Sequence, residues 1–168
     1  MAARAAGGDE LNPRKILLLS AVALAVPVLQ AALFNNLIFA GGIIHLILLY
    51  VIWVSASLTR FQALPLAAVM GFFADASSDL WGLHLFSMVL TIYLFHPVLV
   101  RFRQNRYLLW QITLVLLLTV FTHNSILIFV SLFAEQYASG FSVVTKLTSD
   151  TLMTTGFGVI IYLLIPEK

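Results

Sequence analysis

The sequence predicts an all-α membrane protein, a bundle of six transmembrane helices. Of its 168 residues, 61% are hydrophobic and only 10% are charged, and the mean hydropathy is +1.02. An ordinary soluble domain is roughly 45–50% apolar and about 25% charged, and a domain of this size still exposes about a third of its surface. The surrounding medium therefore has to be lipid. Together with the absence of cysteine, this excludes a cytosolic enzyme, a nucleic-acid binder and a secreted disulfide scaffold.

Six apolar runs are long enough to cross the hydrocarbon core, which takes about 20 residues of α-helix. Charged and turn-forming residues separate the runs, and no connection between them is long enough to form another domain. The runs cover residues 14–34, 39–58, 61–78, 82–100, 107–132 and 147–165. We expect one transmembrane domain over residues 14–166, preceded by a short cytoplasmic segment at 1–13.

The first run has a recognisable start and one internal break. Asn12 is a suitable N-cap residue, and Pro13 stands in the first turn, where no backbone N–H is needed. Pro27 lies mid-span and should kink the helix, which neighbouring helices in a bundle tolerate. The run exceeds the 7–15 apolar residues typical of a signal peptide, and five more spans follow. We therefore expect it to remain as a helix of the mature protein.

The positions of Lys and Arg predict the orientation. With the N-terminus in the cytoplasm, eight of the nine basic residues lie on the cytoplasmic side, and Lys146 alone lies outside. The eight are Arg4, Arg14, Lys15, Arg60, Arg101, Arg103, Arg106 and Lys168. This asymmetry favours an even number of spans with both termini inside. The arginines between the fourth and fifth runs should hold that loop beside anionic lipid.

The third run carries a stripe of small and acidic residues at intervals of four: Ala67, Gly71, Asp75 and Asp79. Residues four apart share a helix face, and Ala67 with Gly71 lets another backbone approach closely. At about 1.5 Å per residue from Arg60, Asp75 lies in the outer leaflet, where a carboxylate is costly. It either lines a pocket or binds a partner, or it is a structural group near a helix end. Asp79 fits a solvated loop better.

Three histidines and one more aspartate fall toward the outer side. His45 begins the second run, His84 begins the fourth, His123 lies in the fifth and Asp150 begins the sixth. These residues suit an outward-facing pocket, and imidazole with carboxylate suits a divalent transition metal. They come from different helices, however, and no H-x-x-x-H pair places two histidines on one helix face. Separate hydrogen bonds at helix ends and between helices explain them better, so no metal site is predicted.

Polar residues within the runs favour contacts between helices over catalysis. The sequence Thr-His-Asn-Ser at 122–125 is typical of interhelical hydrogen bonds. The chain has no H-E-x-x-H, G-x-S-x-G or G-x-G-x-x-G motif. An aspartyl dyad needs carboxylates about 3 Å apart, which Asp75 and Asp79, four residues apart on one helix, would rarely hold. We expect no enzymatic activity and no cofactor.

A spaced motif covers residues 71–94. Gly71 precedes Asp75 by four residues, a short polar turn follows, Gly82 opens the fourth run, and the aromatic Tyr93 lies three turns later. This pattern resembles the rod shape-determining protein MreD family, whose signature is a G-x-x-x-D at the outer end of helix 3 followed by such a glycine and aromatic. The stretch LILLYVIW in the second run is similar to the Leu/Tyr-rich second helix of that family.

The resemblance implies a non-catalytic scaffold in the bacterial inner (cytoplasmic) membrane. The expected partner is MreC, whose single membrane helix would pack on the bundle, within a complex that also holds MreB filaments, RodA and a class B penicillin-binding protein. Such a scaffold helps couple the filament to peptidoglycan synthesis and cell shape. Gly71 and Gly82 would allow close backbone packing, and Asp75 would fix the turn between the third and fourth helices or contact a partner. No nucleic-acid partner is expected.

The MreD fold is also similar to the substrate-binding S components of energy-coupling-factor transporters, which gives the main alternative. An S component holds a vitamin or metal in an outward-facing pocket, which the outer histidines and Asp150 would suit. Small residues in an A-x-x-x-A pattern on the first helix contact the coupling subunit in those proteins, and Ala21 and Ala25 fit this spacing.

Overall fold

All the secondary-structure elements in the part of the chain that the structure describes are helices. The computed structural model describes residues 13–34, 42–78, 82–104, 108–133 and 143–164. Its elements are α1 (Pro13–Leu29), the π-helical segment η1 (Gln30–Phe34), α2 (Leu46–Ser55), α3 (Arg60–Ser78), α4 (Leu83–Gln104), α5 (Leu109–Phe133) and α6 (Val143–Leu164). The all-α fold class predicted from the sequence is confirmed for these ranges.

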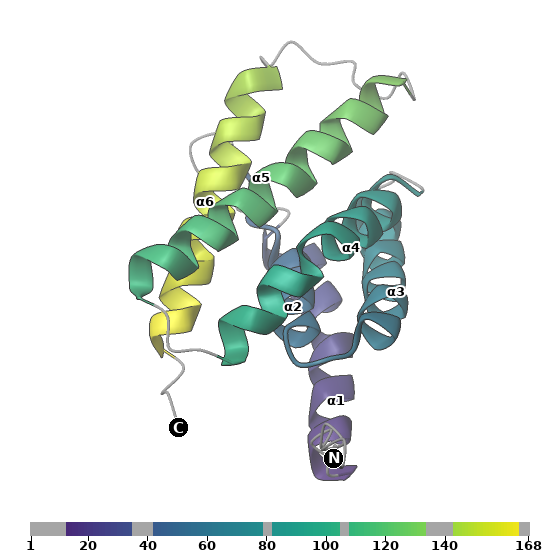
Figure 1. The fold of residues 1–168 in the computed structure, drawn as a ribbon. Coiled ribbons are helices and arrows are strands. Elements are labelled where there is room, and N and C mark those ends of the chain that lie inside the picture. The colour runs from purple at the N-terminus through teal and green to yellow at the C-terminus, as the bar shows by residue number, and fades with distance from the viewer. Residues whose placement is uncertain (1–12, 35–41, 79–81, 105–107, 134–142, 165–168) are drawn as a thin grey trace.

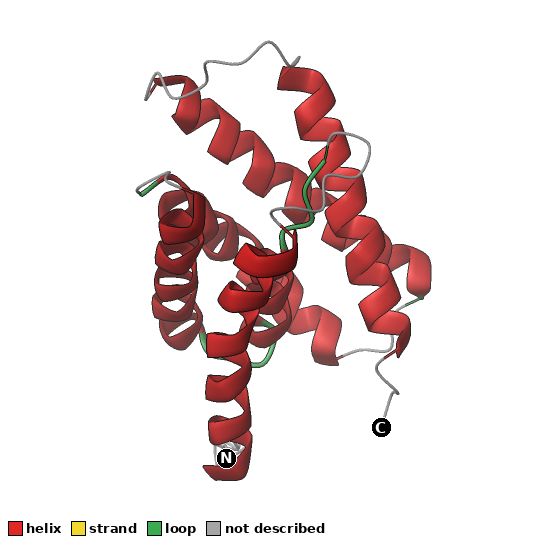
Figure 2. Ribbon diagram, turned by 180° about the vertical axis from the view of Figure 1, so that it is seen from behind, coloured by secondary structure: helices red, strands yellow, loops and turns green. Residues whose placement is uncertain are grey.

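The helices run alternately up and down in the view of Figure 1. The α3 and α4 helices form one antiparallel pair and α5 and α6 a second, while α4 also packs against α5. The short α2 contacts α1, α3, α4 and α6. Figures 1 and 2 place the first turn of α1 and the last turn of α6 at the same end of the bundle.

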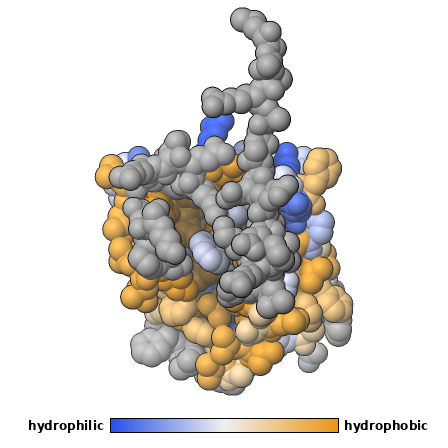
Figure 3. All heavy atoms as spheres, turned by 90° about the horizontal axis from the view of Figure 1, so that it is seen from below, coloured by the Kyte–Doolittle hydropathy of each residue, from blue (hydrophilic) through white to orange (hydrophobic). Residues whose placement is uncertain are grey.

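Among the described residues, three helical segments are long and apolar enough to cross a membrane: Leu83–Arg101, Leu109–Phe133 and Val143–Leu164. Two further apolar helical stretches, Leu19–Phe34 and Leu46–Ser55, are shorter. Apolar side chains make up most of the described surface seen from below in Figure 3. Large exposed apolar surfaces of this kind mark a membrane or protein contact. The chain therefore has the character of a membrane protein.

The predicted helix boundaries hold for three of the six runs. The first, third and fifth runs match α1 with η1, α3 and α5 to within two residues. Pro27 lies inside α1, close before the π-helical segment; its missing N–H leaves one backbone carbonyl without its usual partner. The fourth helix continues four residues past the predicted end at 100, although it contains Pro97. The sixth begins four residues before 147, because Lys146 sits within a helical turn instead of ending it.

The second helix is much shorter than predicted. Instead of covering 39–58, α2 has 10 residues, and residues 43–45 before it are not helical. Ten residues rise about 15 Å, which is half of the roughly 30 Å hydrocarbon core. The prediction of a long second helix was wrong, because apolar composition alone does not show whether the backbone N–H and C=O groups bond within a helix or to other groups.

Side chains from distant helices satisfy the non-helical backbone before α2. Asp150 Oδ1 accepts the N–H of Ile43 at 2.8 Å. Gln30 Oε1 accepts the N–H of Leu46 at 2.6 Å, and Gln30 Nε2 donates to the carbonyl of Ile44 at 3.0 Å. Irregular backbone at membrane depth is tolerated where protein groups replace the missing hydrogen bonds. The segment is therefore built into the bundle by α6 and η1.

Small residues bring α3 and α4 together. Ala63, Ala67 and Gly71 are buried along one face of α3, as the spacing of four predicts. Met88 and Ile92 of α4 lie in the same apolar core. This close packing fixes the α3–α4 turn, where the candidate site begins.

Candidate functional site

Asp75 supplies the N-terminal cap of α4 from the neighbouring helix. Only 1% of the residue is exposed. Its Oδ1 accepts the backbone N–H of His84 at 2.7 Å, and its Oδ2 accepts those of Gly82 at 2.9 Å and Leu85 at 3.1 Å. The first N–H groups of a helix have no partner within it, and the helix dipole favours a negative charge there. Of the two interpretations left open for Asp75, the geometry favours a structural group at a helix end.

The two motif glycines serve different purposes. A Cβ on Gly71 would lie 2.5 Å from the Cα of Leu85, so this glycine allows the close approach predicted for it. Gly82 has φ +87°, and a Cβ placed on it would meet nothing within 4 Å. The prediction of close packing at Gly82 is therefore wrong; the turn needs glycine there because other residues rarely adopt positive φ.

Tyr93 lies away from this turn, and Asp79 lies outside the described residues. The ring of Tyr93 is half-exposed and carries the guanidinium of Arg60 at 4.1 Å from its centroid. Arg60 also donates to the Tyr93 carbonyl at 2.7 Å. This cation–π contact and hydrogen bond join the start of α3 to the middle of α4, so Tyr93 has a packing role in the structure.

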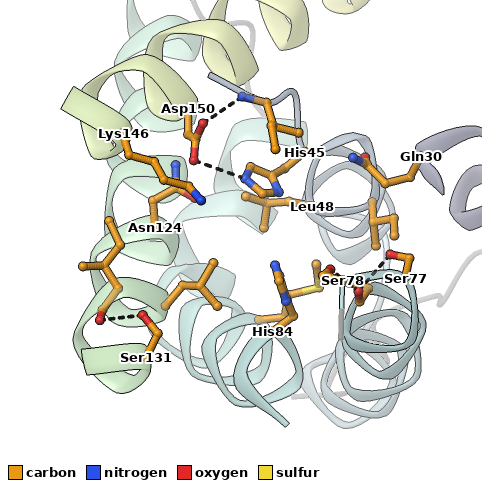
Figure 4. Close-up of a pocket in the computed structure, with 16 residues that line it drawn as sticks. Gln30, His45, Leu48, Ser77, Ser78, His84, Asn124, Ser131, Lys146 and Asp150 are labelled. Atoms are coloured by element: carbon orange, nitrogen blue, oxygen red, sulfur yellow. Dashed lines mark hydrogen bonds and ion pairs between the residues drawn. The ribbon is translucent and has the colours of Figure 1, made fainter. Parts of the chain in front are cut away.

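A cavity of about 360 Å³ lies beside the α3–α4 turn. It falls in the size range of small-molecule sites, about 300–1,000 Å³. Apolar residues of α2, α4 and α5 form part of its wall. Its polar lining, much of it visible in Figure 4, comprises Gln30, His45, Ser77, Ser78, His84, Asn124, Ser131, Lys146 and Asp150.

Three histidines gather at or beside this cavity: His45 directly before α2, His84 in α4 and His123 in α5. The ring centroids of His45 and His84 are 6.1 Å apart, those of His45 and His123 6.2 Å, and those of His84 and His123 6.3 Å. Figure 4 shows His45 and His84 on different walls, with the ring of His84 directed toward His45. His96 lies elsewhere, within 3.0 Å of the Leu58 carbonyl through Nε2. The four site residues expected to line an outward-facing pocket thus gather in one place, although His123 lies behind the lining.

Two of the three imidazoles each contact a carboxylate. Nδ1 of His84 is 3.2 Å from Oδ1 of Asp75. Nε2 of His45 is 3.8 Å from Oδ2 of Asp150, whose other oxygen binds the backbone of Ile43. The contact of His84 is a hydrogen bond of the kind that the sequence favoured. The contact of His45 is too long for one, and its Nε2 makes no hydrogen bond in the structure.

The third imidazole has no carboxylate partner. His123 is 0% exposed, and neither ring nitrogen makes a hydrogen bond of ordinary geometry, although the backbone of Ser87 lies near. The next residue, Asn124, donates to the hydroxyl of Thr151 at 3.1 Å. That bond joins α5 to α6, so the predicted interhelical contact is found at Asn124, whereas the hydroxyl of Ser125 donates to the Phe121 carbonyl in its own helix. Within the described ranges, no group of three or more His, Asp or Glu side chains is arranged to hold a metal ion as the side chains stand.

Comparisons with models of protein families, with curated proteins and with solved structures find no match. The site is therefore interpreted from its own geometry. Six of the nine polar lining residues were not selected from the sequence as site residues: Gln30, Ser77, Ser78, Asn124, Ser131 and Lys146. Gln30 is an uncharged polar residue in the apolar stretch that follows Ser20, and that contrast was the signal available for it. The cavity offers imidazole, amide, hydroxyl, carboxylate and ammonium groups to a small polar ligand.

Proposed function

We propose that the chain is a non-catalytic scaffold of the bacterial cell-elongation complex, embedded in the inner membrane through six helices with both termini in the cytoplasm. It would bind MreC and, through it, help couple MreB filaments to peptidoglycan synthesis by RodA and a class B penicillin-binding protein. The proposal rests on the resemblance of the motif spacing to the MreD family, and the geometry of the motif residues supports it.

The observation that carries this proposal is the way the motif residues act together. Gly71 allows α4 to approach, Gly82 turns the chain, and Asp75 binds three backbone N–H groups at the new helix start. Each residue of the G-x-x-x-D and the following glycine thus has a physical role in one hairpin. A signature that specifies a helical hairpin is suited to a protein that presents helix surfaces to partners.

Affinity purification of the full chain in mild detergent, co-expressed with MreC from the same source, tests the scaffold proposal. We expect MreC to be enriched relative to an unrelated six-span protein carrying the same tag. The Asp75→Asn variant should lose enrichment, because its hairpin is misformed, whereas Gly156→Ala should retain it, since a Cβ there meets nothing within 4 Å. Equal recovery of MreC with the wild type and the unrelated protein would contradict the proposal.

The cavity favours a second candidate function, a substrate-binding S component of an energy-coupling-factor transporter. Its volume of about 360 Å³ and its mixed apolar and polar lining suit a vitamin-sized ligand. Native mass spectrometry of the purified chain tests this alternative. A small organic molecule bound at near-unit stoichiometry would place the S component ahead of the scaffold, and a chain of unliganded mass would remove the alternative's support.

A further inference from the structure

We infer that His45, His84 and His123 form a binding site for one divalent transition metal ion of the zinc class. Imidazole nitrogen is a preferred ligand of such ions, and three histidines with one open position form a known type of zinc site. The inference uses the positions of these residues alone and does not depend on the scaffold proposal.

The size of the histidine triangle suits a central ion. With sides of 6.1–6.3 Å, its centre lies about 3.6 Å from each ring centroid (the mean side divided by √3). A zinc–nitrogen bond of about 2.0–2.1 Å places an imidazole centroid about 3.2 Å from the metal. Each ring therefore needs to move inward by about 0.4 Å and to turn a nitrogen toward the centre. As the side chains stand, the three rings are not arranged to hold an ion, so binding requires rotations about their side-chain bonds.

The carboxylates leave the correct nitrogens available. Asp75 lies against Nδ1 of His84, so Nε2 of that ring is the ligand. Asp150 lies nearest Nε2 of His45, so Nδ1 is the ligand there. Metal-binding histidines almost always engage a carboxylate, carbonyl or water through their second nitrogen, which fixes the ring orientation. The ring of His84 already has such a partner, whereas Asp150 lies 3.8 Å from Nε2 of His45 and has to approach before it can serve as one.

His123 is the observation that favours a ligand over simple packing. A buried imidazole normally has hydrogen-bond partners, yet both nitrogens of this 0% exposed ring lack one. A metal at the centre of the triangle would satisfy one of these nitrogens. The ring of His123, which has no hydrogen-bond partner, would thus serve as a metal ligand beside the other two rings.

The local charge is compatible with a cation. Asp75 and Asp150 provide two carboxylates beside the rings. Lys146 lines the same cavity and opposes a cation, but two carboxylates outweigh one ammonium. A bound ion would join the starts of α2 and α4 to the middle of α5, so its first effect would be to hold these three helices together.

Metal titration of the full chain in mild detergent, after removal of bound ions with EDTA, tests the inference. We expect one Zn²⁺ per chain by elemental analysis, an increase of the thermal unfolding temperature with Zn²⁺, and, with Co²⁺ as probe, the strong visible absorption of a four-coordinate site. His45→Gln, His84→Gln and His123→Gln should each weaken the affinity at least tenfold. Asp150→Asn, which keeps an acceptor for the Ile43 N–H, should weaken it about 10–100-fold.

His96→Gln is the matched control, because this histidine lies outside the cluster, and it should bind Zn²⁺ as the wild type does. A cluster variant could fail to fold and give no affinity. X-ray absorption of the zinc-loaded wild type then still tests the inference, because it counts the imidazole ligands directly. Three imidazoles support the inference. A wild type that retains no Zn²⁺, fewer than three imidazoles on the metal, or a folded His123→Gln chain with unchanged affinity overturns it.

Discussion

The carboxylate of Asp75 contacts His84 twice, through the backbone N–H at 2.7 Å and through ring Nδ1 at 3.2 Å. The backbone bond caps α4, whereas the ring contact orients an imidazole that lines the cavity. One side chain thus links the formation of the α3–α4 hairpin to the shape of the cavity. Substitutions at this position are therefore expected to change both the stability and the cavity.

Asp75→Asn should lower the free energy of unfolding by about 2–3 kcal/mol, since hydrogen bonds to a buried charged group are worth about 1.5–3 kcal/mol each and an amide can replace only one of the two oxygens. Unfolding by SDS titration from mild detergent measures the change. Ser78→Ala on the same helix is the control, because its hydroxyl bonds only the carbonyl of Ala74 in its own helix. A similar loss in both variants would remove the special role of the carboxylate.

Gly71→Ala should also destabilise the hairpin. The new Cβ would lie 2.5 Å from the Cα of Leu85 and 2.9 Å from its N, and a neighbouring backbone cannot move aside as a side-chain tip can. Overpacking of this kind costs about 1–3 kcal/mol. Gly156→Ala, with open space around its Cβ, should instead gain about 0.5–1 kcal/mol in the helix interior. Thermal unfolding of the two variants side by side tests the sign of each effect; destabilisation of both would contradict the assignment to packing.

Gly82→Ala should cost about 1–2 kcal/mol through its backbone alone. The residue has φ +87°, and the added methyl group would meet no atom within 4 Å, so backbone strain is the whole effect. Gly82→Asn should cost less, because asparagine adopts left-handed conformations more readily. The same SDS titration ranks the three chains, and equal stability of the alanine and asparagine variants would argue against backbone strain.

Much of the fold could be predicted from the sequence, because long apolar runs have few alternatives in lipid. The motif spacing also identified Gly71 and Asp75 correctly as partners in one feature. The length of α2 could not be predicted, since it depends on Gln30 and Asp150 reaching the backbone from distant positions. Sequence periodicity carries no information about such long-range bonds.

The histidine cluster illustrates the same limit at the candidate site. His45, His84 and His123 share no ligand spacing in the sequence, so each looked like a separate polar residue near a helix end. Their meeting depends on the crossing of α2, α4 and α5, which is a property of packing. The charge asymmetry predicts that the three residues share the outer side, but it carries no information about the distances between the rings.

Gln30 provides a test of how the short α2 is stabilised. It is 4% exposed and bonds both the carbonyl of Ile44 and the N–H of Leu46. Gln30→Leu leaves these two backbone groups unsatisfied, and each buried unsatisfied group costs about 1–3 kcal/mol. We therefore expect a loss of about 2–4 kcal/mol in SDS titration and faster hydrogen exchange at the Leu46 amide. Gln62→Leu is the matched control: its Oε1 also accepts a backbone N–H, but on the exposed surface, where water replaces the lost bond. Equal losses in the two variants, or an unchanged exchange rate at Leu46, would show that the segment before α2 is held by other contacts.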